Sequence, residues 1–190
     1  MKIKTTYTNY TYVSLLRGIN VGGKNIIKMD KLKQCFVDMG FFDVKTYIQS
    51  GNIIFKTKDS DKLKLTKKID KQLLKTFSSE IRTVIFSINE LMEIIENAPK
   101  NFGTEPEKFR YDVCFLMPPI TVDKIISTVP LREGIDYIET GKNTIYISRL
   151  VSELSKSYMQ KIIKTPIYKN ITVRNWNTTT KLLKLACNSN

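Results

Sequence analysis

The sequence contains no histidine among its 190 residues. This absence removes the commonest general base near neutral pH, the usual zinc ligand and any Ser-His-Asp arrangement. The three cysteines, Cys35, Cys114 and Cys187, are far apart and have apolar neighbours, so no CxxC metal or redox spacing exists. We therefore expect reduced, buried thiols, no metal site and no cofactor.

Long apolar runs are also missing. No run approaches the ~18 residues that span a bilayer. Residues 1–12, MKIKTTYTNYTY, lack the apolar segment of a signal peptide. We expect a soluble, cytoplasmic protein with no membrane partner, and the sequence gives no indication of its oligomeric state.

Acidic residues are scarce. The 18 Asp and Glu face 31 Lys and Arg, which leaves a formal net charge of +13. After Glu153 no acidic residue follows, while lysines and Arg174 continue to the end. Such an excess favours anionic partners, although a general bias towards Lys, Ile and Asn explains it equally well. With 42% hydrophobic residues the chain can still form a core.

Alternating and helical apolar patterns predict the first half of the fold. Ser50-Gly51 separates two β-rich runs as a hairpin, Asp30 is a plausible N-cap, and Gly40 is a helix-end signal. The resulting order, β-α-β-β-α-β, is the ferredoxin-like split βαβ pattern. The predicted elements are strand 10–16, a helix after Asp30, strands 44–49 and 52–57, helix 61–77 and strand 81–87.

A capping-box spacing at Ser87 and Glu90 then begins a helix through Asn97, and Pro99 ends it. Residues 100–110 resemble a linker, which gives an N-terminal unit over 1–99 and a C-terminal unit over 111–190. The second unit repeats the element order, with strand 111–117, helix 121–128, strands 136–140 and 144–148, helix 153–164, a strand near 171–173 and a final helix at about 177–186. We thus expect an α+β protein of two ferredoxin-like (βαββαβ) units packed together, with an added C-terminal helix.

The stretch Leu15–Asn25, LLRGINVGGKN, fits the G-x-x-x-x-G-K part of a phosphate-binding loop. It lacks the Ser or Thr after the lysine that holds Mg²⁺, a helix beginning there, and a Walker B aspartate elsewhere. This excludes a Walker-type NTPase. Arg17, Gly22, Gly23 and Lys24 can still form an anion-binding nest, although a plain glycine loop is equally compatible.

Two further polar clusters accompany this stretch. In split βαβ topology the strand that begins at Asn52 pairs with the strand that ends at Arg17, so Gln49, Ser50 and Asn52 should share a sheet edge with the glycine loop. A simple turn role for Ser50 is as plausible. The second cluster is residues 172–181, TVRNWNTTTK, in which Asn177 or Thr178 could cap a helix and Trp176 could fill the seam between the units.

An RNA-recognition domain is an alternative, because a ferredoxin-like sheet can stack bases on its open face. Tyr12, Tyr47 and Ile54 would occupy that face here. The alternating glycine and aromatic pattern of such domains is absent from 52–57. A second unit that covered this face would use these residues as core instead.

The segments LLRGINVGGKN, TYIQSGN and TVRNWNTTTKL together resemble the widespread bacterial family called domain of unknown function 1697, and Leu154-Ser155-Lys156 stands at the place of its Ser-Lys motif. The resemblance covers nearly the whole chain. It implies a compact α+β protein of two ferredoxin-like parts and no established activity. The motif positions are Arg17, Gly18, Asn20, Gly22, Gly23, Gln49, Ser50, Gly51, Asn52, Ser155, Lys156, Arg174, Asn175 and Lys181.

We expect an anionic small molecule, for example a phosphate-bearing one, to bind in a cleft between the two units, with or without catalysis. Non-enzymatic nucleic-acid binding by the basic C-terminal quarter is the alternative, and a structural or adaptor role is the third. The expected ligand-binding residues are Arg17, Asn20, Gly22, Gly23, Lys24, Gln49, Ser50, Asn52, Lys156, Arg174, Asn175 and Lys181.

Overall fold

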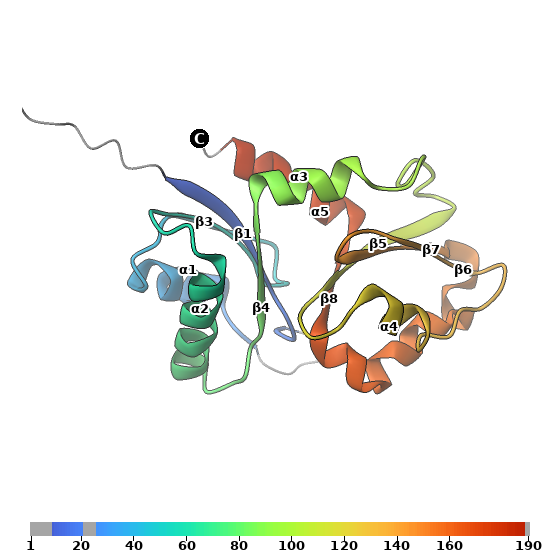
Figure 1. Cartoon of the computed structure of the whole chain (residues 1–190), viewed down its shortest axis with the longest axis horizontal. Coiled ribbons are helices and arrows are strands. Elements are labelled where there is room, and N and C mark those ends of the chain that lie inside the picture. Colours follow the sequence, from blue (N-terminus) through green and yellow to red (C-terminus); the bar gives the residue numbers. More distant parts are fainter. Residues whose placement is uncertain (1–8, 21–25, 189–190) are drawn as a thin grey trace, which may run out of the picture. The chain divides into compact units, whose positions relative to one another are not determined.

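The computed structural model describes residues 9–20 and 26–188 of the chain (Figure 1). Two compact units emerge: unit 1 comprises Met1–Glu90 and Leu182–Asn190, and unit 2 comprises Leu91–Lys181. The boundaries fall within helices α3 (Ile88–Glu96) and α5 (Trp176–Cys187). Residues 100–110, which the sequence suggests as a linker, are therefore part of unit 2.

Unit 1 is built on a four-stranded antiparallel sheet in the order β2-β3-β1-β4. Its elements are β1 (Tyr10–Leu16), α1 (Met29–Asp38), β2 (Phe42–Tyr47), β3 (Asn52–Thr57), α2 (Lys62–Phe77) and β4 (Thr83–Ser87). The first strand lies beside the third and the second lies at an edge, which confirms the predicted split βαβ topology.

Both helices of unit 1 cover one face of this sheet (Figure 1). Tyr12, Leu16, Ile53 and Phe55 project from that face because alternate residues of a strand share a side. They pack against apolar side chains of the helices, which are Leu32, Cys35, Phe36, Leu65, Ile69 and Leu73. Each such large side chain contributes about 1.5–3 kcal/mol when it leaves water, so this layer holds the unit together.

Capping side chains mark the beginnings of α2 and α3. The Asp61 side chain accepts a hydrogen bond from Lys64 N at 3.0 Å and begins α2. Ser87 and Glu90 form the predicted capping box, in which Ser87 N donates to Glu90 Oε2 at 2.8 Å and Glu90 N donates to Ser87 Oγ at 3.2 Å. Asp30 is not the N-cap of α1, because the helix begins earlier, after Lys28, and has no side-chain cap; Asp30 lies in its first turn.

Unit 2 repeats the topology, with strand order β6-β7-β5-β8 and antiparallel pairing. Its elements are β5 (Phe109–Leu116), α4 (Val122–Ile126), β6 (Asp136–Thr140), β7 (Thr144–Leu150), the 3-10 helices η1 (Val151–Lys156), η2 (Tyr158–Lys164) and η3 (Pro166–Asn170), and β8 (Ile171–Asn175). Helix α5 follows β8. The two four-stranded sheets and the C-terminal helix confirm the predicted α+β fold class.

The predicted α-helix over 153–164 is wrong, because this stretch forms 3-10 turns with a break at Ser157. Ser157 is extended, with φ −60° and ψ 136°. Its Oγ donates to Asp136 Oδ1 at 2.5 Å, and Tyr158 N donates to Asp136 Oδ2 at 2.8 Å. These bonds to a distant carboxylate replace the local bonds that a continuous α-helix would need.

Unit 2 has an apolar layer on one sheet face and an aromatic cluster that includes the segment after α3. Cys114, Ile145 and Ile147 pack with α4 and the 3-10 helices. The Phe102 ring lies 4.9 Å from Tyr111, 5.4 Å from Tyr146 and 5.1 Å from Trp176, all edge to face. Trp176 thus has a packing role inside unit 2.

Candidate ligand-binding corner at the end of strand β1

The end of β1 meets two other chain segments through backbone hydrogen bonds. Leu16 N donates to Gly51 O at 2.8 Å, and Arg17 N donates to Arg82 O at 2.9 Å. This confirms the predicted meeting of the β1 end with the Ser50-Gly51 hairpin at one sheet edge. We call residues 16–20, 48–52 and Arg82 the β1 corner.

Asn20 ties the corner together with one side chain. Its Nδ2 donates to Ile27 O at 3.1 Å and to Gln49 O at 2.8 Å, and its Oδ1 accepts from Ile27 N at 2.7 Å. Its backbone is left-handed, with φ +54°, which asparagine tolerates better than most residues. Asn20 therefore holds Ile27 and the hairpin residue Gln49 together.

Hydrogen bonds within the hairpin itself also fix its residues. Asn52 is fully buried, and its Nδ2 donates to Tyr47 O at 3.0 Å and to Ser50 Oγ at 2.9 Å. Gly51 has φ +72°, and an added Cβ would lie 2.8 Å from side-chain atoms of Leu16 and Ile19. Only glycine fits there. Asn52 therefore helps to build the corner from a buried position, whereas the Gln49 side chain is exposed. A role for Asn52 in ligand binding stays a prediction.

Arg17 and Arg82 extend the register of β1 and β4 by one step. The last paired residues of these strands are Leu16 and Thr83, and the bond from Arg17 N to Arg82 O continues the pairing. Directly opposite residues have Cβ atoms about 4.5–5.5 Å apart and side chains on the same face. Sequence reasoning missed Arg82, which only the antiparallel register of β1 and β4 brings opposite Arg17. Both arginines are partly exposed.

Gly22, Gly23 and Lys24, which the sequence suggests as an anion-binding nest, lie outside the described residues.

Arg174 in β8 is buried, with 7% of its surface exposed. Its Nη1 donates to Thr172 Oγ1 and to Val173 O, both at 2.9 Å. Burial lowers the pKa of the guanidinium to about 10, which still leaves it charged at neutral pH. Its role in binding one anion with Arg17 stays a prediction.

Asn175 caps α5, a role that the sequence suggests for Asn177 or Thr178. Its Oδ1 accepts from Asn177 N at 3.0 Å, and its Nδ2 donates to Tyr111 O at 2.9 Å. Both the oxygen and the nitrogen of the Asn175 side-chain amide thus form hydrogen bonds to the backbone. One N–H donor and one oxygen lone pair of this amide are therefore occupied by bonds within the chain.

The two lysines predicted for the site differ in their surroundings. Lys156 Nζ lies 2.6 Å from Glu153 Oε2 in an exposed ion pair. Lys181 is exposed on α5. Exposed pairs contribute about 0–1 kcal/mol, so Glu153 does not prevent Lys156 from binding another anion.

The base-stacking face expected for an RNA-recognition domain is not formed by the predicted residues. Tyr12 belongs to the face that the helices cover, whereas Ile54 lies opposite Val13 on the other face. Val13 and Ile54 are themselves buried. Tyr12 and Ile54 therefore cannot form one exposed platform.

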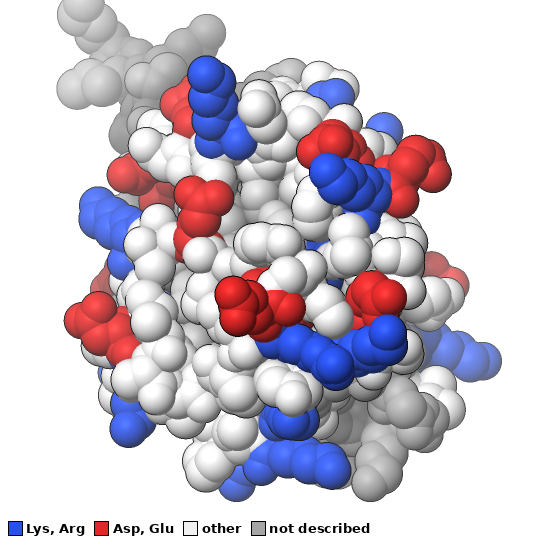
Figure 2. Space-filling view, turned by 90° about the vertical axis from the view of Figure 1, so that its right-hand side faces the viewer, with Lys and Arg blue, Asp and Glu red and all other residues white. Residues whose placement is uncertain are grey.

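Charged side chains of both signs are interspersed on the face shown in Figure 2, with uncharged surface between them. Basic side chains gather at its lower edge only. Nucleic-acid-binding proteins usually present a continuous basic patch or stripe. The coloured residues on this face form no such continuous surface.

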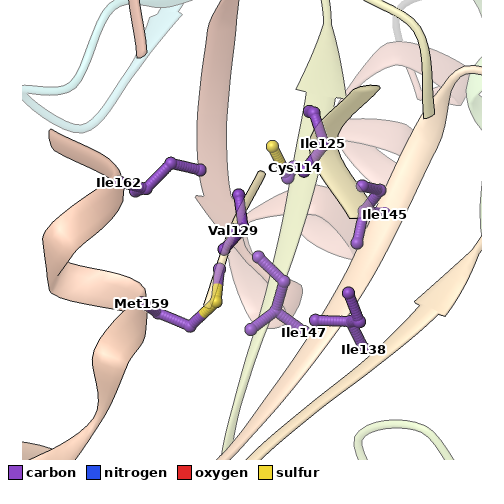
Figure 3. A pocket seen from close by; sticks show the side chains of 8 residues that line it. All are labelled: Cys114, Ile125, Val129, Ile138, Ile145, Ile147, Met159 and Ile162. Carbon is purple, nitrogen blue, oxygen red and sulfur yellow. The ribbon is translucent and has the colours of Figure 1, made fainter. Parts of the chain in front are cut away.

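The apolar layer of unit 2 contains a small, partly open pocket of about 10 Å³ (Figure 3). Side chains of Cys114, Ile147, Met159 and Ile162 point towards it, and its lining contains no polar surface. A space for one water without polar partners stays dry, so this is a packing defect and not a ligand site.

The cysteines give no reactive centre in the buried layers. Burial raises the pKa of Cys114 to about 12, and burial also raises the pKa of Cys35. Cys187 is exposed, which corrects the expectation that all three thiols are buried. Within residues 9–20 and 26–188, no group of three or more Cys, Asp or Glu side chains is placed to hold a metal ion.

The fold and the β1 corner define an α+β protein with two split βαβ sheets. A family model described as "Protein of unknown function (DUF1697)" matches residues 10–146, and the chain belongs to this family. It is similar to the solved structure of the conserved bacterial protein SP0830 from Streptococcus pneumoniae, with 30% identity and a TM-score of 0.82. That match covers 94% of this chain and 99% of the other. No curated protein matches the chain.

Among the helices that the structure describes, none has the length and apolar character needed to cross a membrane.

Proposed function

We propose that this protein binds an anionic small molecule, such as a phosphate-bearing metabolite, at the β1 corner. The observation that carries the proposal is the position of Arg17 opposite Arg82 at the ends of two adjacent strands. Two guanidinium groups on one face can together bind the oxygens of a phosphate or carboxylate. Gln49, whose backbone carbonyl accepts a hydrogen bond from Asn20 in the same corner, has an exposed side-chain amide.

The electrostatics favour a bound anion. The Cβ atoms of directly opposite residues are about 5 Å apart. Guanidinium groups that came as close as this would repel each other by roughly 1 kcal/mol in a water-like dielectric and by ~3 kcal/mol at a protein surface. An anion close to both groups offsets this repulsion. The net charge of +13 also raises the local concentration of anions around the protein.

The corner is held in place before any ligand binds. Asn20, Gly51 and Asn52 fix the chain around the end of β1 by hydrogen bonds and close packing. A preformed site loses less conformational entropy on binding than a flexible one. This supports a specific ligand over loose association with any polyanion.

The wider prediction from the sequence is that Lys24, Lys156, Arg174, Asn175 and Lys181 bind the same anion. Its test is energetic coupling. If Arg17 and Arg174 bind one anion, the effects of the single and double alanine variants on affinity are non-additive. Additive effects would exclude a shared ligand.

A thermal-shift screen against inorganic phosphate, pyrophosphate, sugar phosphates and nucleotides tests the main proposal. A ligand at 100 times its Kd adds ~2.7 kcal/mol of stability. We expect Arg17→Ala and Arg82→Ala to lose this gain. Lys71→Ala, which removes one exposed positive charge from α2, is the matched control and should keep it. Equal losses in all three variants would show a non-specific effect of net charge and would contradict the proposal.

Nucleic-acid binding by unit 2 is the second candidate. Lys161, Lys164 and Lys169 are exposed on the 3-10 helices, in a part of the chain without acidic residues. Lys161 Nζ and the Arg132 guanidinium lie 3.4 Å and 5.6 Å from the centre of the Tyr158 ring. Binding to DNA or RNA through these groups would weaken steeply with salt, whereas alanine at Arg17 would change it little.

A further inference from the structure

Ile48 has a backbone conformation that disfavours its own side chain. Its φ is +47°, in the left-handed region, and it is β-branched, which makes this conformation a true outlier. Half of its surface, 50%, is exposed, so core burial offsets little of this strain. Asparagine or glycine would form the same turn at lower cost. Strain of this kind is concentrated at functional sites.

A second exposed isoleucine, Ile26, directly precedes Ile27, whose backbone is bound by the Asn20 side chain. Ile26 is 77% exposed. Asn20 Nδ2 donates to Ile27 O at 3.1 Å and to Gln49 O at 2.8 Å. Ile27 follows Ile26 in the chain, and Gln49 follows Ile48. Each exposed isoleucine therefore directly precedes a residue whose carbonyl oxygen accepts from the Asn20 side chain.

The strand order sets the distance from these isoleucines to the arginines. Ile48 directly follows Tyr47, the last residue of β2, and β2 is separated from β1 by β3 alone. Neighbouring strands lie 4.7–4.9 Å apart, so Ile48 is about 10 Å from Arg17 along the sheet edge. A ligand with a charged head and an apolar chain of moderate length spans this distance.

We propose that the ligand of the β1 corner is an amphiphilic anion, with its phosphate or carboxylate at Arg17 and Arg82 and its apolar part against Ile48 and Ile26. This inference rests on the anion site proposed above and names the class of its ligand. It explains why a strained position carries an exposed isoleucine. Removing the exposed parts of these two side chains and a matching ligand area from water strengthens binding at least tenfold.

Calorimetric titration of the full chain with three probes tests the inference: inorganic phosphate, octyl phosphate below its micelle concentration, and octanol. We expect octyl phosphate to bind at least about tenfold more tightly than inorganic phosphate. Ile48→Asn should reduce this preference to below about threefold while the melting temperature stays equal or rises, because asparagine tolerates the left-handed backbone. Leu63→Ser, which removes an exposed apolar side chain from α2, is the matched control and should keep the full preference.

Each outcome separates the inference from the proposed function. Equal affinity for inorganic and octyl phosphate would overturn the apolar contact and leave the anion site standing. Octanol binding as tightly as octyl phosphate would instead overturn the anion site. A full octyl preference in Ile48→Asn, with a lowered melting temperature, would show that Ile48 has only a structural role and would also overturn the inference.

Discussion

Replacing Asn20 with alanine removes the three side-chain hydrogen bonds that close the β1 corner. Each contributes about 0.5–1.5 kcal/mol net, and water replaces part of this because the site is partly exposed. Alanine in the left-handed conformation at φ +54° costs a further ~1 kcal/mol or more. We expect the free energy of unfolding to fall by about 2–4 kcal/mol, measured by urea denaturation with circular dichroism.

Two companion variants separate the causes. Asn20→Gly loses the same hydrogen bonds without the backbone strain, so it should cost about 1 kcal/mol less than Asn20→Ala. Asn20→Asp can still accept from Ile27 N, but it sets a carboxylate against the carbonyl oxygens of Ile27 and Gln49. It should therefore be at least as damaging as alanine. A loss below about 0.5 kcal/mol in Asn20→Ala would refute the role of Asn20 as the tie of the corner.

Three further predictions concern the core and its ionisable groups. In urea denaturation, Gly51→Ala should lower the free energy of unfolding by about 2–4 kcal/mol and Gly18→Ala by only about 1 kcal/mol. Both glycines have a positive φ, but of the two only Gly51 lacks room for a Cβ. Burial raises the pKa of Asp70 in the folded protein, and the opposing effects of Thr83 and Arg82 are weaker. The ionisation of Asp70 therefore destabilises the fold as the pH rises above 3.8, its ordinary pKa. Asp70→Asn should raise the free energy of unfolding at pH 7 and lose this gain below pH ~3.8. A thiol reagent at pH 8 should modify Cys187 in the folded protein and reach Cys114 only after unfolding; rapid labelling of Cys114 would contradict its burial.

The fold was largely predictable from the sequence because its signals are local. Alternation in residues 10–16 and 52–57 gave both strands, and Ser87 with Glu90 gave the capping box. Split βαβ topology then paired β1 with β3. The 3-10 stretch was not predictable in this way, because Ser157 breaks the helix through a bond to Asp136, 21 positions earlier in the chain.

The candidate site was only partly predictable, for a related reason. Sequence reasoning found Arg17, Asn20 and Gln49 by their unusual chemistry, but it could not separate ligand-facing groups from groups that build the corner. Arg82 has no local motif and depends on the register of β4 against β1. The burial of Arg174 likewise depends on what packs over β8, which periodicity does not reveal.

A double-mutant cycle on Arg17 and Arg82, with inorganic pyrophosphate as the probe in calorimetric titration, tests the central claim most directly. If both guanidinium groups bind one anion, each alanine variant should weaken binding at least about tenfold, and the double variant should show a coupling of 0.5–3 kcal/mol. The Lys71→Ala control should bind like the unaltered protein. Affinity that is unchanged in Arg17→Ala and Arg82→Ala, or that falls equally in Lys71→Ala, would contradict the account.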